Sequence, residues 1–256
     1  MIQSVDRASR ILKALSAGAP ERLGVSELSE RLGFAKGTVH GLLRTLQAHG
    51  LVEQHRETGK YQLGAGVLEL SAGYLDNNEL RTRALAWSEL LAVRSGESVR
   101  VGVPNGRGIV IIHHVFRPDA SLQILEVGAV LPLHATALGK AALAYMPSEV
   151  VDEILSGELP RLTAHTRVTR EALMDDLEGV RERRYALESE EAVIGDSAIA
   201  APIFERRGGL VGAIGIAAPQ ERLADGERQS SLADSVIEVA RSISRDLGAP
   251  TWPAVG

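Results

Sequence analysis

AKGTVHGLLRTLQAHG, at residues 35–50, is the stretch of this chain that decides its fold. Its apolar residues recur at i, i+3, i+4 and i+7, which is the spacing of one face of a helix. These residues are Val39, Leu42, Leu43 and Leu46. Gly50 follows them and predicts the end of the helix, because glycine readily takes the left-handed conformation that closes a helix. We therefore predict a helix that docks by one face on a small core.

The other face of this predicted helix carries small, hydroxyl and cationic groups. They are Lys36, Gly37, Thr38, His40, Gly41 and Arg44. The fork of Arg44 matches guanine O6 and N7, and Thr38 offers a hydroxyl to phosphate and a methyl to thymine. The alternative is that all six residues are exposed to solvent and have no role in binding. We interpret the stretch as a recognition helix for the DNA major groove.

The flanking sequence supports a winged helix-turn-helix. Apolar residues repeat at helical spacing from residue 5 to residue 15, before Gly18 and Pro20, and Ser26 opens a second short helix at residues 26–33. Two helices joined by a short turn, the second apolar on one side, are typical of a helix-turn-helix.

A hairpin follows the recognition helix. Two strand-like runs, residues 51–55 and 60–63, are separated by a polar segment that ends in Gly59. Such a hairpin is a wing, and we expect Arg56 and Lys60 at its tip, within reach of backbone phosphate. The predicted DNA-binding domain spans residues 1–65.

Composition sets the limits on function. The 256 residues include no cysteine, which excludes disulfides and thiolate metal sites, and no apolar run approaches the roughly 20 residues that a bilayer requires. The start of the chain lacks a signal-peptide pattern, so we expect a cytoplasmic protein without a membrane partner. Nine of the 28 Lys and Arg residues and seven of the 33 Asp and Glu residues precede residue 74, which gives that part +2 and the remainder −7. Only the N-terminal part suits DNA, and its small surplus predicts a binder that depends on dimerisation.

The remaining chain predicts a linker helix at 66–75, an α+β domain at 76–250 and a tail at 251–256. Hairpins beside helices indicate an antiparallel or mixed sheet that is flanked by helices. The expected strands are 98–103, 109–115, 122–127, a short one near Leu187, 198–204 and 210–217. The expected helices are 79–96, 136–146, 148–156, 171–184 and 228–247.

A succession of motifs resembles the IclR family of bacterial transcriptional regulators. They are VSELSERLGFAKGTVHGLLRTLQAHGLVEQ at 25–54, GKYQLG at 59–64, PLHATALGKA at 132–141, the segment 188–202 and GLVGAIGIAAP at 209–219. Within that family, YLDNNELRTRALAW at 74–87, SGESVRVGV at 95–103 and IIHHVFRPD at 111–119 look most like the glycerol-operon repressors. The resemblance implies a GAF-like effector domain and a homodimer or tetramer on a palindromic operator.

The resemblance also implies a ligand pocket between the sheet and the helix that begins in PLHATALGKA. Thr136, Ala137 and Leu138 form the start of that helix, whose N–H groups favour an oxyanion or a hydroxyl oxygen. The positions that match the acid, the small polar residue and the two serines of carboxylate-binding members are Glu188, Ala198, Gly215 and Ala217. Only the acid is kept, which disfavours a keto acid and favours a polyol such as glycerol, or its phosphate. We expect no arginine in the pocket strands, so a phosphate would rely on the helix terminus.

Family members often have serine at position 37 and arginine at position 41. Glycine at both positions suggests that Arg44 and the wing carry more of the DNA recognition here.

Other chemistries are disfavoured. His113 and His114 are adjacent on a predicted strand and point to opposite faces, so at most one can join His134, and we expect no metal site and no cofactor. Lys140 lacks the context of a P-loop lysine and is expected to cover the helix surface or pair with an acid.

The rival interpretation is an enzyme or a binding module whose N-terminal helices serve only in assembly. A single carboxylate, Glu188, makes poor acid-base machinery, so we predict a ligand-responsive DNA-binding regulator with no catalytic residues. A repressor is favoured, and an activator would use the same parts.

Overall fold

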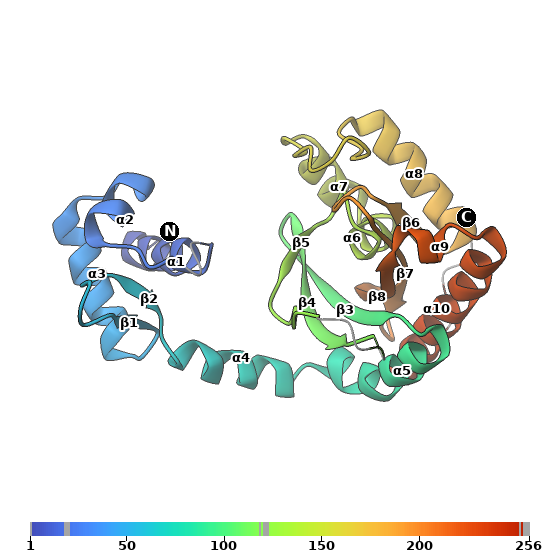
Figure 1. Cartoon of the computed structure of the whole chain (residues 1–256), viewed down its shortest axis with the longest axis horizontal. Coiled ribbons are helices and arrows are strands. Elements are labelled where there is room, and N and C mark those ends of the chain that lie inside the picture. Colours follow the sequence, from blue (N-terminus) through green and yellow to red (C-terminus); the bar gives the residue numbers. More distant parts are fainter. Residues whose placement is uncertain (1, 18–20, 118, 120–122, 251, 253–256) are drawn as a thin grey trace. The chain divides into compact units, whose positions relative to one another are not determined.

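The computed structural model describes residues 2–17, 21–117, 119, 123–250 and 252. The chain forms two compact units, Met1–Asn77 and Asn78–Gly256 (Figure 1). Among the described residues, we find no helix with the length and apolar character needed to cross a bilayer.

The first unit is a helical domain with a hairpin. Its elements are α1 (Gln3–Ala17), α2 (Val25–Leu32), α3 (Lys36–Ala48), β1 (Val52–Gln54), β2 (Tyr61–Leu63) and α4 (Gly66–Asp76). Apolar residues of α1, α2 and α3 meet in its core, where Ile11, Leu28 and Val39 have no solvent exposure. Helix α2 begins after Gly24, not at Ser26, because the Glu27 carboxylate accepts a hydrogen bond from the Gly24 N–H. The predicted stop at Gly18 and Pro20 lies outside the described residues.

The second unit is built on a six-stranded antiparallel sheet. Its strands are β3 (Ser98–Asn105), β4 (Gly108–Val115), β5 (Val130–Pro132), β6 (Ala186–Ser189), β7 (Asp196–Phe204) and β8 (Leu210–Pro219), in the order β5-β4-β3-β8-β7-β6. Consecutive residues of β7, Ile199, Ala200 and Ala201, are all fully buried. Successive strand residues point to opposite faces, so both faces of the sheet are covered at this point.

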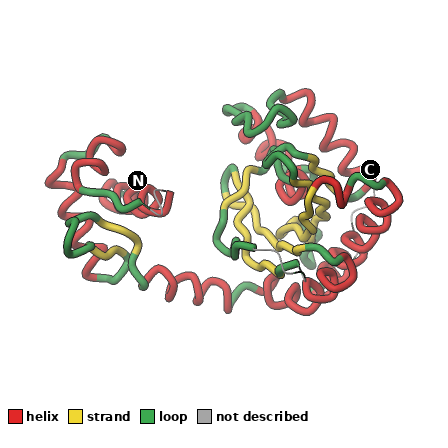
Figure 2. The backbone as a smooth tube through the Cα atoms, viewed as in Figure 1, coloured by secondary structure: helices red, strands yellow, loops and turns green. Residues whose placement is uncertain are grey.

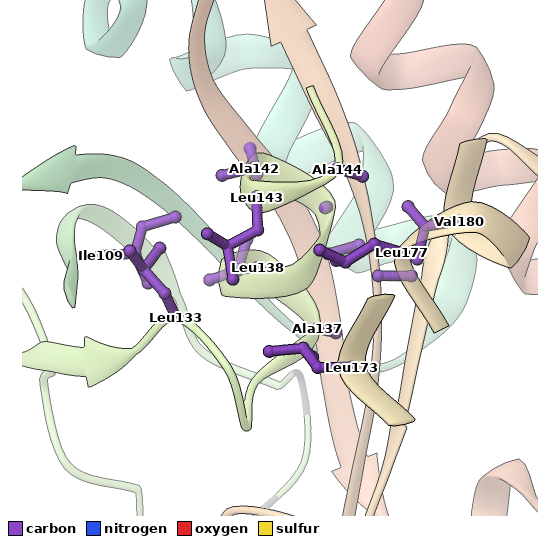
Figure 3. Close-up of a cluster of buried hydrophobic side chains, with 14 of the residues drawn as sticks. Ile109, Leu133, Ala137, Leu138, Ala142, Leu143, Ala144, Leu173, Leu177 and Val180 are labelled. Atoms are coloured by element: carbon purple, nitrogen blue, oxygen red, sulfur yellow. The ribbon is translucent and has the colours of Figure 1, made fainter. Parts of the chain in front are cut away.

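Helices provide this cover (Figure 2). They are α5 (Glu79–Ser95), α6 (Ala137–Leu143), α7 (Ser148–Leu155), α8 (Arg170–Arg183), α9 (Gln220–Leu223) and α10 (Gly226–Asp246). Helices α5 and α10 pack against each other, while α6 packs on β7 and β8. Figure 3 shows the α6 side chains between Ile109 and Leu133 on one side and the α8 residues Leu177 and Val180 on the other.

The strand that we predicted at 122–127 is wrong for its described part. Residue 122 lies outside the described residues, and 123–126 has no regular secondary structure. Ile124 and Leu125 are 79% and 61% exposed, so neither of these consecutive apolar residues is packed as a strand residue would be. Backbone hydrogen bonding to β4 begins at Gly128, which takes φ = +89° and donates its N–H to the Ile111 carbonyl.

Candidate functional site

Helix α3 separates the predicted core residues from the predicted DNA-facing residues. Val39 and Leu43 have no solvent exposure, and Leu46 is also buried. The residues Lys36, Gly37, His40, Gly41 and Arg44 are exposed, and Thr38 is half-buried. The structure therefore places all six predicted contact residues outside the core, on the accessible part of one helix.

Gly37 and Gly41 have no packing requirement within the described residues. No heavy atom lies within 4 Å of the position that a Cβ would take at either residue, and neither backbone has a positive φ. Glycine inside a helix costs roughly 1 kcal/mol relative to alanine. Helix α3 therefore carries two destabilising residues for which the fold of this unit gives no reason.

The two hairpin residues that we predicted to contact DNA phosphate have different surroundings. Arg56 is exposed and lies in the turn between β1 and β2. Lys60 lies at the other end of the same turn, next to β2, and its Nζ is 2.9 Å from Glu27 Oε1. The hydrogen bond from the Gly24 N–H, together with that from Lys60, lowers the pKa of Glu27. Lys60 thus ties the hairpin to α2.

All seven predicted effector residues line one cavity of about 110 Å³ in the second unit. They are Thr136, Ala137, Leu138, Glu188, Ala198, Gly215 and Ala217. A single water needs about 10–15 Å³ by this kind of measure, so the cavity suits several waters or a small organic molecule. The strand register accounts for the convergence, since Ala198 pairs with both Glu188 and Ala217.

The start of α6 offers less to a ligand than we predicted. The Thr136 Oγ1 accepts a hydrogen bond from the Gly139 N–H at 3.2 Å and donates to the Pro132 carbonyl at 2.8 Å. The helix has only seven residues, all of them buried. The Thr136 hydroxyl and one N–H group at the start of α6 are therefore already hydrogen-bonded within the protein.

Glu188 is the buried acid of the cavity, with 4% of its surface exposed. Its Oε1 accepts hydrogen bonds from the N–H groups of Glu191 and Ala192, at 2.8 and 3.2 Å. Burial raises the pKa of Glu188 to about 7, although these hydrogen bonds act in the opposite direction. Near neutral pH the carboxyl group can therefore donate a hydrogen bond to a ligand or accept one from it.

A buried ion cluster supports the loop after β6, whose N–H groups donate to Glu188. Lys140 Nζ lies 2.7 Å from each of three acceptors, Asp176 Oδ2, Glu191 Oε1 and the Leu187 carbonyl oxygen, which confirms that it pairs with acids. Burial alone would raise the pKa of Asp176, but the charge and hydrogen bond of Lys140, together with Arg167 and Arg183, outweigh burial and the pKa is lowered. Arg167 contacts both acids from the outer side of the cluster.

The sequence interpretation missed an arginine in the cavity. Arg100 of β3 lines it, and its Nη2 donates to Glu126 Oε1 at 3.0 Å. The alternation in SVRVGV places Ser98 and Arg100 on one face of the strand. That signal becomes informative only once β3 is known to pair with β8, which sets Arg100 opposite Gly215. The expectation of a pocket without arginine is therefore wrong.

The three histidines have separate surroundings. His134 Nε2 lies 2.9 Å from the Pro160 carbonyl oxygen, and His114 Nδ1 accepts a hydrogen bond from the Glu126 N–H at 3.3 Å. Burial, with the nearby charge of Arg100, lowers the pKa of His114 to about 4. In the described part of the chain, no three His, Cys, Asp or Glu residues are grouped so that they could hold a metal ion.

Comparison with known proteins covers both units. The profile of the IclR helix-turn-helix domain matches residues 4–56, and that of the bacterial transcriptional regulator IclR C-terminal domain matches residues 72–245. The chain is 48% identical to the glycerol operon regulatory protein of Streptomyces griseus and 49% identical to that of Streptomyces coelicolor. Each match runs over 249 residues and covers 97% of both chains.

The fold is also similar to a solved structure. A crystal structure of an IclR-type transcriptional regulator from a Silicibacter species superposes with a TM-score of 0.86 at 26% sequence identity. The match covers 98% of this chain and 100% of the other.

Proposed function

The chain belongs to the IclR family of bacterial transcriptional regulators, and from that premise we propose that it represses a catabolic operon until a small polyol effector binds. It is a DNA-binding regulator with a ligand-binding C-terminal domain, and its relatives are named as regulators, so it is not an enzyme. The observation that carries the proposal is the convergence of seven predicted effector residues on one cavity. An operator-binding protein works beside the chromosome, so we place it in the cytoplasm.

We assign operator recognition to the exposed face of α3. Arg44 would read a guanine through its two parallel N–H donors, while Lys36, Thr38 and His40 would contact phosphate or base edges. The small surfaces at Gly37 and Gly41 would let the helix approach the DNA closely. Arg56 in the wing would contact phosphate, and Lys60 would do so only if it left Glu27.

Two copies are needed for useful affinity on this view. A surplus of two positive charges up to residue 73 gives little non-specific attraction, and doubling the contacts on a palindromic operator compensates for it. Helix α4 has no buried residue within its own chain, and its Leu68 and Leu70 are 72% and 66% exposed. Large apolar side chains in such a position support a surface that a second copy covers, in a homodimer or a tetramer.

The effector we propose is glycerol or glycerol 3-phosphate. The glycerol operon regulatory proteins that resemble this chain are named for that pathway. The cavity supports a hydroxylated ligand of this size, because the Glu188 carboxyl group that lines it can accept a hydrogen bond from an alcohol. The effector would shift operator affinity by the difference between its affinities for two conformations.

The test is a gel-shift titration of the protein's own upstream DNA at fixed salt, with and without each ligand. A specific shift that glycerol or its phosphate releases would support the whole proposal. A specific shift that neither releases would overturn the effector and keep the regulator. Isothermal titration with both ligands, performed without DNA, separates failure to bind from failure to signal.

A further inference from the structure

Arg100 stands between two cavities of the second unit. It lines the effector cavity together with Glu188, and it also lines a second cavity of about 190 Å³ that includes Ser98 and His114. Both cavities share Arg100, Glu126, Asp196 and Ala217. Its register partner on β8 is Gly215, which has no side chain, and its partner on β4 is His114.

The guanidinium of Arg100 is occupied by an internal carboxylate. Glu126 accepts a hydrogen bond from Nη2 of Arg100 and makes an ion-pair contact with Nε, the two nitrogens that an arginine also offers to a phosphate. The two side chains are 24% and 29% exposed, but the atoms Nε and Oε2 themselves are buried. An anion that replaced the carboxylate would keep the buried guanidinium paired.

Glu126 lies in a segment that allows it to move away from Arg100. It lies in residues 123–126, which form no helix or strand, and its N–H makes a long hydrogen bond of 3.3 Å to His114 Nδ1. By contrast, Arg100 is fixed in the middle of β3 between β4 and β8. A competing anion would therefore displace the carboxylate and leave the arginine in place.

A second observation points to the same ligand chemistry. His114 is 91% buried, and its Nε2 has no hydrogen-bond partner among the described residues. Since Nδ1 accepts from Glu126, the proton of the neutral ring is assigned to Nε2, which leaves a buried donor unsatisfied beside the second cavity. Arg117, which lines the same cavity, is already paired with Glu97 and Asp119.

The charge balance defines what can bind. Arg100 is the one cationic side chain among the described residues that line the effector cavity, against the acids Glu126, Glu188 and Asp196. Asp196 is exposed and screened by solvent. While Glu126 neutralises Arg100, an anion gains little binding free energy from the arginine. The binding of a neutral polyol does not depend on whether that ion pair is formed.

We propose that Arg100 recognises the phosphate group of a polyol phosphate effector, which takes the place of Glu126 on the guanidinium. This inference rests on the proposed effector site and makes the phosphate, not the free polyol, the preferred ligand. It requires that Glu126 opposes binding of the anion and that Arg100 supports it, so substitutions at the two residues have opposite effects.

The experiment is isothermal titration of the full chain with glycerol 3-phosphate, glycerol and inorganic phosphate. We expect Arg100→Gln to weaken glycerol 3-phosphate binding at least roughly tenfold, because a bidentate charge-assisted contact is lost. Glu126→Gln should tighten it several-fold, and affinity for glycerol should change less than about twofold in both variants. Arg100→Lys, which keeps the charge but not the fork, should give an intermediate affinity.

The matched control is Arg170→Gln, which removes another ion-paired arginine of the same unit, at the start of α8, and should leave all three titrations unchanged. Unchanged glycerol 3-phosphate affinity in Arg100→Gln, or weaker binding in Glu126→Gln, would overturn the inference.

If the wild-type protein binds neither glycerol nor its phosphate, the proposed effector fails, and inorganic phosphate still decides the role of Arg100. Binding of phosphate to Glu126→Gln that disappears when Arg100→Gln is added would support that role. No phosphate binding to Glu126→Gln would overturn it.

Discussion

Lys140 Nζ lies 2.7 Å from Glu191 Oε1 at a point where the lysine has no solvent exposure, and the N–H of the same Glu191 donates to the cavity acid Glu188. One side chain on α6 therefore fixes the loop that shapes the effector cavity. Both partners are buried, so removing either one leaves the other in the interior without its ion-pair partner.

Lys140→Met should destabilise the second unit by about 3 kcal/mol, because it leaves buried carboxylates with only part of their compensation. Arg167 and Arg183 still reach Asp176, which limits the loss. Both tryptophans, Trp87 and Trp252, belong to the second unit, so denaturant unfolding followed by tryptophan fluorescence reports on that unit. Arg170→Met, at an exposed pair, should cost no more than about 1 kcal/mol. Equal losses in the two variants would contradict the role of the buried cluster.

Glu188 should make the stability of the second unit depend on pH. Its folded pKa of about 7 lies above the ordinary 4.5, so between these values the folded chain holds a proton that the unfolded chain has released. Stability therefore falls as pH rises through this window, by on the order of 3 kcal/mol, and the loss is complete above pH 7. Glu188→Gln should remove this part of the slope in unfolding curves measured from pH 4.5 to pH 8. A slope that persists unchanged in the variant would assign the effect to another group.

Gly41→Ala should act in opposite directions on folding and on DNA binding. The methyl group meets open space, so helix α3 gains up to about 1 kcal/mol of stability. The same methyl should weaken operator binding if the bare helix face lies close to DNA. Thermal unfolding by circular dichroism and gel-shift affinity measure the two effects. Gly226→Ala, at another open glycine in α10, is the control and should leave operator affinity unchanged.

Arg44→Ala should weaken specific operator binding by about 1–3 kcal/mol, roughly fivefold to 150-fold, because the paired contacts to a guanine are lost. Ligand titrations of the second unit's cavity should not change. Arg94→Ala, which removes an exposed arginine paired with Glu238, provides the comparison. Operator affinity retained in Arg44→Ala, measured by gel shift at fixed salt, would refute the assigned role.

Local patterns in the sequence predicted the local structure well. The i, i+3, i+4, i+7 spacing around Val39 and Leu43 identified the buried face of α3, and both residues are fully buried. Thr136 was expected at the start of a helix, and it caps α6 through the Gly139 N–H. In each case the residues that decide the structure lie within one or two helical turns of each other.

Features that depend on distant partners were missed. The ion pair between Lys60 and Glu27 was missed because the two residues are 33 positions apart in the sequence. Arg100 was overlooked because its strand neighbour, Gly215, is far along the chain, and alternation within β3 does not say which strand lies beside it. A strand was predicted at 122–127, but the packing that would bury Ile124 and Leu125 is missing, and both are exposed.

The open glycines of α3 also bear on how such a regulator can change its target. A Cβ added at Gly37 or Gly41 meets open space, and the core residues on the opposite face of the helix would keep their packing. New operator preferences are therefore accessible by single substitutions that leave folding intact. The same two positions are natural starting points for redirecting this regulator to another promoter while its effector response is kept.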